Sequence, residues 1–258
     1  EFYRLTDPDK MNAAQWHFAG PTRPVEELFD CQKDPDNLNN LASSKEHQEA
    51  LEHLRKEHKR HIRRTVDLGF LPESEAWTMF EGSSGWEMGQ GGKVSAGPSQ
   101  KAAAQVGVAD EGAFIKNLSS KDANVRYWGA IGMTALKDKP SSKALKKLKT
   151  SLKDSSAAVR IEAANALAAH GDIKAALPAL VKDLAHENLI IVTHAARTIE
   201  LLGKKAASVA PQMKKALERA EKIRPPDLSP VIVLPGDKDL AMFVAFSCQA
   251  FLERLGRK

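Results

Sequence analysis

The sequence predicts two parts of different fold class: an α+β subdomain and, after it, an all-α solenoid built from helical repeats. Three observations lead to this prediction. The two halves differ in charge, a glycine-rich stretch separates them, and the second half repeats at a nearly constant spacing. The length of 258 residues suits one or two domains. We expect residues 1–81 to form the subdomain, residues 82–109 a Gly/Ser-rich linker, and residues 110–258 the solenoid.

The charge difference bears on binding partners. Residues 1–81 contain 11 Lys and Arg against 16 Asp and Glu, whereas residues 82–258 contain 27 against 17. A positive field attracts polyanions such as sulfated glycans, nucleic acid or anionic lipid. The alternative is that the lysines only keep a repeat domain in solution. The longest aliphatic runs are far shorter than the roughly 20 residues of a spanning helix, so we expect no membrane span.

The glycine-rich stretch indicates the boundary. Six of the 16 glycines lie between Gly82 and Gly97, together with several serines. This composition disfavours both helix and strand, and it predicts a linker or a loop.

Before this boundary, the pattern predicts two helices and a short strand. Residues 6–18 have a helical pattern, residues 24–30 are typical of a short strand, and a turn over 34–41 leads to a helix over 45–65. Six Lys and Arg lie near the end of that last helix, between Arg55 and Arg64. They could bind a glycan or nucleic acid, but cations are also favourable by themselves at a helix C-terminus.

After the boundary, the chain repeats. Residues 118–130 align with residues 152–164 at a shift of 34, and residues 184–196 follow 32 later. A fixed period of this length predicts a solenoid in which each unit has two helices joined by a short polar turn. A fourth unit is expected around an insertion that contains four prolines, Pro225, Pro226, Pro230 and Pro235.

The repeat pattern resembles the HEAT-repeat family over residues 110–256. The resemblance is carried by the acidic residue of each turn, the Val-Arg step after it and the small residues that follow. In the third unit, Val192 replaces the usual Arg. We expect Arg126 and Arg160 to pair with acidic residues of the turns, Asp122 and Asp154; binding of an anionic ligand is the alternative.

The segment from Arg23 to Asp30, followed by Asp34 to Ala42, resembles a segment near the C-terminus of the formylglycine-dependent sulfatases, which commonly reads RP-x-EELYDL-x-x-DP-x-E-x-x-NLA. Here Phe29, Cys31 and Leu38 replace Tyr, Leu and Glu. The resemblance covers residues 1–81 and is to the C-terminal subdomain of N-sulfoglucosamine sulfohydrolase-like enzymes. It implies a short antiparallel sheet with a packed helix, adjoining an α/β catalytic domain.

The catalytic centre of that family is missing from this sequence. The family's nucleophile is a formylglycine made from Cys or Ser in Cys/Ser-x-Pro-x-Arg, and neither Cys31 nor Cys248 has Pro at that offset. We therefore expect no metal site here, an inactive chain by itself, and calcium and formylglycine in a missing N-terminal catalytic domain. The start at Glu1, without Met or a leader, indicates part of a longer protein. The resemblance suggests a periplasmic or secreted location.

Four residues before the Glu26–Leu28 segment are candidates for substrate binding, because the subdomain contributes to the rim of the active-site cleft in the resembled family: Trp16, His17, Thr22 and Arg23. A guanidinium can bind a sulfate bidentately, and an imidazole can donate to sugar oxygens. The alternative is that Trp16 and His17 only pack the end of the first helix.

These observations lead to a functional hypothesis and an alternative. The hypothesis is the C-terminal part of a sulfatase acting on sulfated saccharides, with a solenoid that binds a sulfated glycan or a protein. The alternative is a non-enzymatic HEAT-repeat module that binds a protein or a polyanion.

Overall fold

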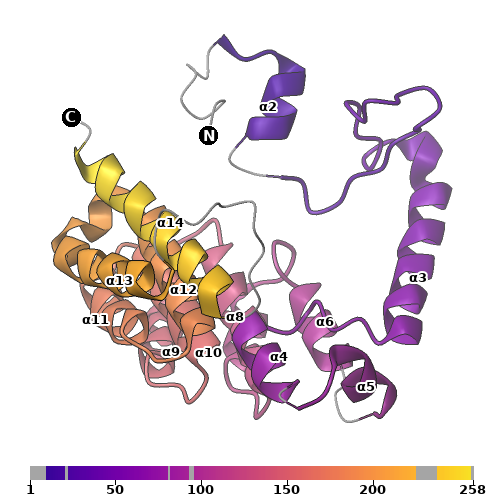
Figure 1. Ribbon diagram of the computed structural model, residues 1–258. Helices are drawn as coiled ribbons and strands as arrows, with labels where there is room; N and C mark the ends of the chain where they lie inside the picture. Colours follow the sequence, from indigo (N-terminus) through magenta and orange to yellow (C-terminus); the bar gives the residue numbers. More distant parts are fainter. Residues whose placement is uncertain (1–9, 21–22, 81, 93–95, 225–236, 257–258) are drawn as a thin grey trace. The chain divides into compact units, whose positions relative to one another are not determined.

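The structure is a computed structural model that describes residues 10–20, 23–80, 82–92, 96–224 and 237–256 (Figure 1). Backbone contacts divide the chain into two units, Glu1–Thr65 and Val66–Lys258. No helix among the described residues is both long enough and apolar enough to cross a membrane. The four prolines of the predicted insertion lie outside these residues.

The first unit contains helices and extended chain. Its helices are α2 (Ala13–Ala19), the short 3₁₀ helix η2 (Lys45–His47) and α3 (Gln48–Thr65). A capping box fixes the start of α2, because Asn12 and Gln15 each accept the other's backbone N–H. Helix α3 buries Leu51 and Ile62.

The predicted α+β class of this unit is wrong. No strand or sheet occurs among the residues that the structure describes, and residues 24–30 form extended chain without a partner strand. The polar groups of this extended chain are satisfied in another way. The Leu28 amide donates to the Asn40 side chain at 3.0 Å, the Asn40 side chain donates to the Glu26 carbonyl at 3.2 Å, and the Leu28 carbonyl accepts from Leu41 at 2.7 Å. One asparagine thus takes the place of the predicted sheet partner.

The second unit is a helical solenoid preceded by three short helices. The short helices are α4 (Glu73–Met79), α5 (Gly85–Gln90) and α6 (Gly97–Ala103). The solenoid helices are α7 (Glu111–Asn117), α8 (Ala123–Thr134), α9 (Ser142–Ser151), α10 (Ala157–Ala169), α11 (Ile173–Leu184), α12 (Leu189–Leu202), the 3₁₀ helix η3 (Gly203–Val209), α13 (Ala210–Ile223) and α14 (Asp237–Gly256).

Two helices, α5 and α6, lie in the glycine-rich segment for which the sequence predicted a linker. Local signals explain them. A capping box between Ser84 and Glu87 begins α5, and Pro98 lies in the first turn of α6, where its missing N–H costs nothing. The contacts place the division between units after Thr65, so α4 belongs with the solenoid.

The solenoid has two layers of helices. In each repeat the first helix packs against the second, and second helices pack against one another: α8 on α10, α10 on α12, and α12 on α14. We call α7, α9, α11 and α13, with η3, the first-helix layer, and α8, α10, α12 and α14 the second-helix layer. The stacked pairs are visible in Figure 1.

Small residues set the spacing between the layers. In α10, Ala163, Ala164, Ala166 and Ala168 are fully buried around Leu167. Short side chains let neighbouring helices approach closely, as the repeat pattern predicted. Among the described glycines, Gly132 in α8 leaves the least room for a side chain, because an added Cβ would lie 2.2 Å from the ring of Phe114 in α7.

Candidate functional site

The sulfatase-like segment of the first unit is a network of turn-forming side chains. Asp30 accepts the amides of Lys33 and Gln32, and these bonds, together with the Lys33 ammonium group, hold the pKa of the Asp30 carboxyl below its usual value. Asp34 accepts the amides of Leu38 at 3.1 Å and Asn39 at 2.7 Å. These bonds satisfy the backbone of two successive turns. Asp30 and Asp34 therefore stabilise the turns of this segment.

Two further carboxylates hold the extended segment to its surroundings. Glu26 accepts from Arg55 of α3, with Nε to Oε2 at 2.8 Å, and this guanidinium lowers the pKa of the Glu26 carboxyl. Glu27 accepts from Arg23 at 2.8 Å. Arg55, from the basic end of α3, therefore has a structural partner.

The structure brings two of the four candidate substrate-binding residues together. Arg23 donates to the carbonyl of His17 at 2.7 Å as well as to Glu27, and the His17 ring lies edge-on to Phe29 with centroids 6.1 Å apart. Trp16 is 45% exposed, and Thr22 lies outside the described residues. Both terminal nitrogens of Arg23 are thus engaged in this arrangement, although half of its side chain is exposed.

Within the described ranges, no group of three His, Cys, Asp or Glu side chains is arranged to hold a metal ion. The thiols differ in environment. Cys31 is exposed, whereas burial, with a smaller contribution from the Glu200 carboxylate, raises the pKa of Cys248 to about 12.

In the second unit, arginines brace the turns between paired helices. Arg126 donates to the carbonyls of Ser120 and Lys121, at 3.1 and 2.9 Å, and forms a bidentate pair with Asp154, at 2.7 Å for both bonds. Burial disfavours the charged form of Asp154, but the bonds from Arg126 and the Ser156 amide outweigh it, so the Asp154 pKa lies below its usual value. The structural interpretation of Arg126 is correct, although its partner is Asp154 and not Asp122.

Arg160 repeats the arrangement one unit later. It donates to the carbonyls of Asp154 and Ser155, at 2.8 and 3.0 Å. Its other nitrogens bind Asp183 of α11, at 3.1 and 2.5 Å. The pair is almost completely enclosed, with side-chain exposures of 10% for Arg160 and 1% for Asp183.

The third turn lacks this arginine, and another residue replaces it. The equivalent carbonyls, those of His186 and Glu187, accept from Arg219 of α13 at 2.6 and 3.1 Å. Alignment of the repeats showed the loss at Val192 but not the replacement, because Arg219 comes from the next first helix. Its only signal in the sequence is an Arg about one period after the turn.

An open groove of about 1180 Å³ lies between α4, the start of α12 and the first half of α14. Three of its aromatic side chains are strongly exposed: Trp77 by 63%, Phe243 by 49% and Phe246 by 50%. Arg197 on its wall is bound by Glu200 at 2.5 Å. Exposed aromatic rings beside a groove can contact an apolar surface of a binding partner. Sequence reasoning missed the groove, because Trp77 was assigned to the first domain.

Helix α4 is fixed to the solenoid by two long-range hydrogen bonds. The Trp128 indole donates to the Phe70 carbonyl at 2.7 Å, just before α4. Ser156, at the start of α10, donates to Glu75 at 2.5 Å. The wall of the groove that α4 supplies is therefore held by α8 and α10.

Comparison with known proteins supports two parts of the sequence interpretation. A family model for HEAT repeats matches residues 112–202. An ulvan-active sulfatase from Formosa agariphila is 44% identical over 75 residues, which is 29% of this chain. The matched part spans 13% of the length of that relative. No solved structure matches the chain.

The chain therefore contains HEAT repeats in residues 112–202 and a stretch similar to part of a sulfatase.

Proposed function

We propose that this chain is an accessory C-terminal part of a sulfatase acting on a sulfated polysaccharide. The observation that carries the proposal is the 44% identity to an ulvan-active sulfatase over 75 residues. Calcium and the formylglycine nucleophile would reside in a separate catalytic domain, which supplies the sulfate ester chemistry. The residues of this chain would shape the cleft rim and bind the substrate or a partner.

The hydrogen bonds of the first unit agree with an accessory role. Asp30, Asp34 and Asn40 each accept backbone amides, so their side-chain oxygens are already used to satisfy backbone N–H groups. A catalytic carboxylate needs an oxygen that faces the reacting group. The motif is therefore best explained as a scaffold that holds the segment before it, where His17 and Arg23 lie.

A test of the proposal compares the complete protein with this chain. We expect the coding sequence upstream of Glu1 to contain Cys/Ser-x-Pro-x-Arg, and the complete protein to release sulfate from ulvan in a calcium-dependent way. Residues 1–258 alone should release none. Metal-dependent sulfate release by residues 1–258 would show that the chemistry has been placed in the wrong domain.

The proposed role of Arg23 at the rim of the active-site cleft can be tested separately in the complete protein. Arg23→Ala should raise KM for the sulfated saccharide while kcat changes little, because a guanidinium at the rim binds substrate without taking part in bond cleavage. Lys33→Ala is a matched control, since Lys33 is an exposed cation in the turn that follows. Equal KM values for Arg23→Ala and the unaltered protein would restrict Arg23 to its structural bond with Glu27.

The second candidate is a HEAT-repeat binding module without sulfatase activity in the complete protein. The match of a HEAT-repeat model to residues 112–202 favours it, because such repeats form extended binding surfaces. An upstream sequence without the nucleophile motif would support this candidate against the first.

A further inference from the structure

The net positive charge of the solenoid helices lies in one of their two layers. Helices α9, α11 and α13 with η3 carry twelve Lys and Arg against three Asp and Glu. The four helices of the second-helix layer carry five of each. Helix α7, at the start of the first-helix layer, carries one Lys and one Glu. The excess therefore belongs to the last three repeats.

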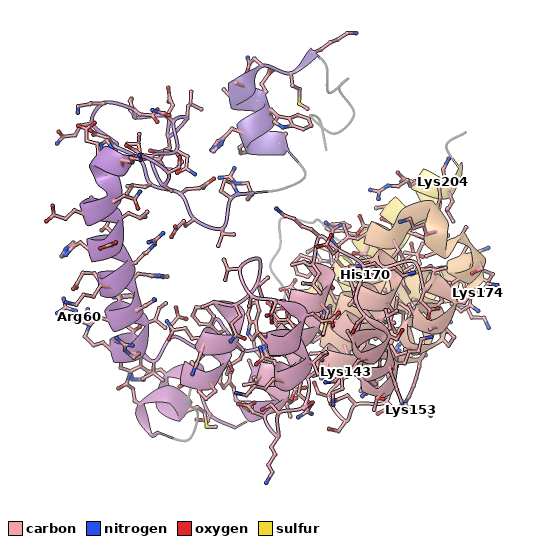
Figure 2. The ribbon with its side chains drawn as sticks, turned by 180° about the vertical axis from the view of Figure 1, so that it is seen from behind. Arg60, Lys143, Lys153, His170, Lys174 and Lys204 are labelled. Carbon is pink, nitrogen blue, oxygen red and sulfur yellow. The ribbon has the colours of Figure 1, made fainter. Side chains whose placement is uncertain are left out.

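Eleven of these twelve cations are lysines, and we call them, together with Lys153 of the following turn, the lysine surface: Lys143, Lys146, Lys147, Lys149, Lys153, Lys174, Lys182, Lys204, Lys205, Lys214, Lys215 and Lys222. All are exposed except Lys147, which is half-buried. In the described part of the chain, Lys149 alone among them forms an ion pair within 4 Å, with Asp172 at 2.8 Å. Figure 2 labels Lys143 and Lys153 of the α9–α10 repeat, Lys174 of α11 and Lys204 of η3, so the labelled lysines come from three successive repeats.

The remaining charges of this layer do not neutralise the surface. Asp183 is buried and bound to Arg160. Arg219, the one arginine, turns back to brace the third turn. Only Glu218 and Glu221 remain as acidic residues on α13. A surface that serves solubility intersperses both signs, whereas a field of one sign favours a charged partner.

We propose that the lysine surface binds a sulfated polysaccharide, which on the proposed function is the substrate chain of the sulfatase. Sulfate groups repeat along such a polymer, and successive repeats of the solenoid present lysines to them. Binding there would keep further sulfate esters near the catalytic domain and raise their effective concentration.

The composition of the surface favours a sulfated polysaccharide over a nucleic acid. No aromatic residue occurs in α9, α11, η3 or α13. Single-stranded nucleic acids are commonly bound by stacking bases on aromatic rings, and guanine edges are commonly read by bidentate arginines. Lysines act as flexible point charges that tolerate irregular anion spacing. The surface should therefore respond to sulfate density and not to the identity of the sugar.

The test measures binding of the purified 258-residue chain to dextran sulfate by fluorescence anisotropy, with unsulfated dextran and a DNA duplex of equal charge as competitors. We expect dextran sulfate to bind, dextran to be inactive, and the duplex to compete more weakly. Affinity should fall steeply with salt, because each ion pair releases a counterion.

A charge-reversal variant locates the site. Lys143→Glu, Lys174→Glu and Lys204→Glu combined should weaken dextran sulfate binding by about tenfold or more. The matched control, Lys101→Glu, Lys116→Glu and Lys121→Glu, changes net charge equally on exposed lysines outside the surface, and should weaken it by less than about threefold. The corresponding Lys→Gln variants remove charge without reversing it, and they provide a second measurement if a reversed variant fails to fold.

Three results would overturn the inference: equal weakening by the control, binding of dextran as strong as that of dextran sulfate, or a preference for the duplex. Failure of this inference can be distinguished from failure of the proposed sulfatase function. If the complete protein releases sulfate but residues 1–258 do not bind dextran sulfate, only the lysine surface is refuted. If the chain binds but the upstream sequence lacks the nucleophile motif, the sulfatase proposal fails and the surface remains.

Discussion

Replacing Arg160 with alanine should strongly destabilise the solenoid, because it removes one partner of a buried ion pair. Arg160 donates to two turn carbonyls and to both oxygens of Asp183, whose side chain is only 1% exposed. In Arg160→Ala, the Asp183 carboxylate would remain buried without its partner. Breaking a buried pair in this way costs about 3–5 kcal/mol, so we expect a loss of that size in the free energy of unfolding.

Arg219 provides the comparison that isolates the buried carboxylate. Arg219 braces the equivalent carbonyls of the third turn, at 2.6 and 3.1 Å, but those bonds are exposed and involve no acidic partner. Arg219→Ala should therefore cost only about 0.5–1.5 kcal/mol. Urea unfolding of residues 1–258, followed by circular dichroism at 222 nm, measures both losses under the same conditions.

The double variant Arg160→Met with Asp183→Leu tests whether the unpaired Asp183 carboxylate causes the loss of stability. It removes both charges together, so it should be less destabilised than Arg160→Ala by more than about 1 kcal/mol. If Arg160→Ala costs less than Arg219→Ala, or if the double variant is the least stable of the three, the uncompensated charge on Asp183 is not what determines stability here.

Three further predictions concern packing and thiol chemistry. Gly132→Ala should lower stability by about 1–3 kcal/mol despite better helix propensity, because the new Cβ would lie 2.2 Å from the Phe114 ring, and Gly132→Ala with Phe114→Leu should recover part of the loss in a urea titration. Ala164→Leu should cost about 1–3 kcal/mol at the fully buried face of α10, and an unchanged thermal melt would refute the repeat register. Ellman's reagent should react with one thiol, Cys31, in the folded chain and with Cys248 only after unfolding; rapid reaction of both would contradict the burial of Cys248.

The solenoid could be predicted from the sequence because its signals are local and repeated. The shifts of 34 and 32 residues align Val159 with Val125 in the first unit and with Ile191 in the third. HEAT repeats are confirmed over residues 112–202. The repeat pattern did not predict which acidic residue each arginine binds. Asp122 was expected to bind Arg126, but its side chain accepts the Asn124 amide at 2.9 Å as a helix cap. Arg126 therefore binds the acidic residue of the next turn.

The first unit shows why an extended pattern is not enough to predict a sheet. Residues 24–30 have the composition of a strand, but a strand needs a neighbour for its amides and carbonyls. Asn40, fourteen residues from Glu26, supplies both a donor and an acceptor from one side chain. No periodicity in the sequence reports such a contact, because it depends on the turns at Asp30 and Asp34 that bring Asn40 back.

The charges that hold the solenoid together and the charges of the lysine surface are different residues. Arg126, Arg160 and Arg219 brace the turns, and their guanidinium groups donate to turn carbonyls. The lysines of the first-helix layer form, with the exception of Lys149, no ion pair within the described residues. Substitutions of exposed residues without such partners usually change stability by less than about 0.5 kcal/mol. The fold therefore does not require the charge excess of this layer, and the proposed binding of a sulfated polysaccharide would give that excess a role.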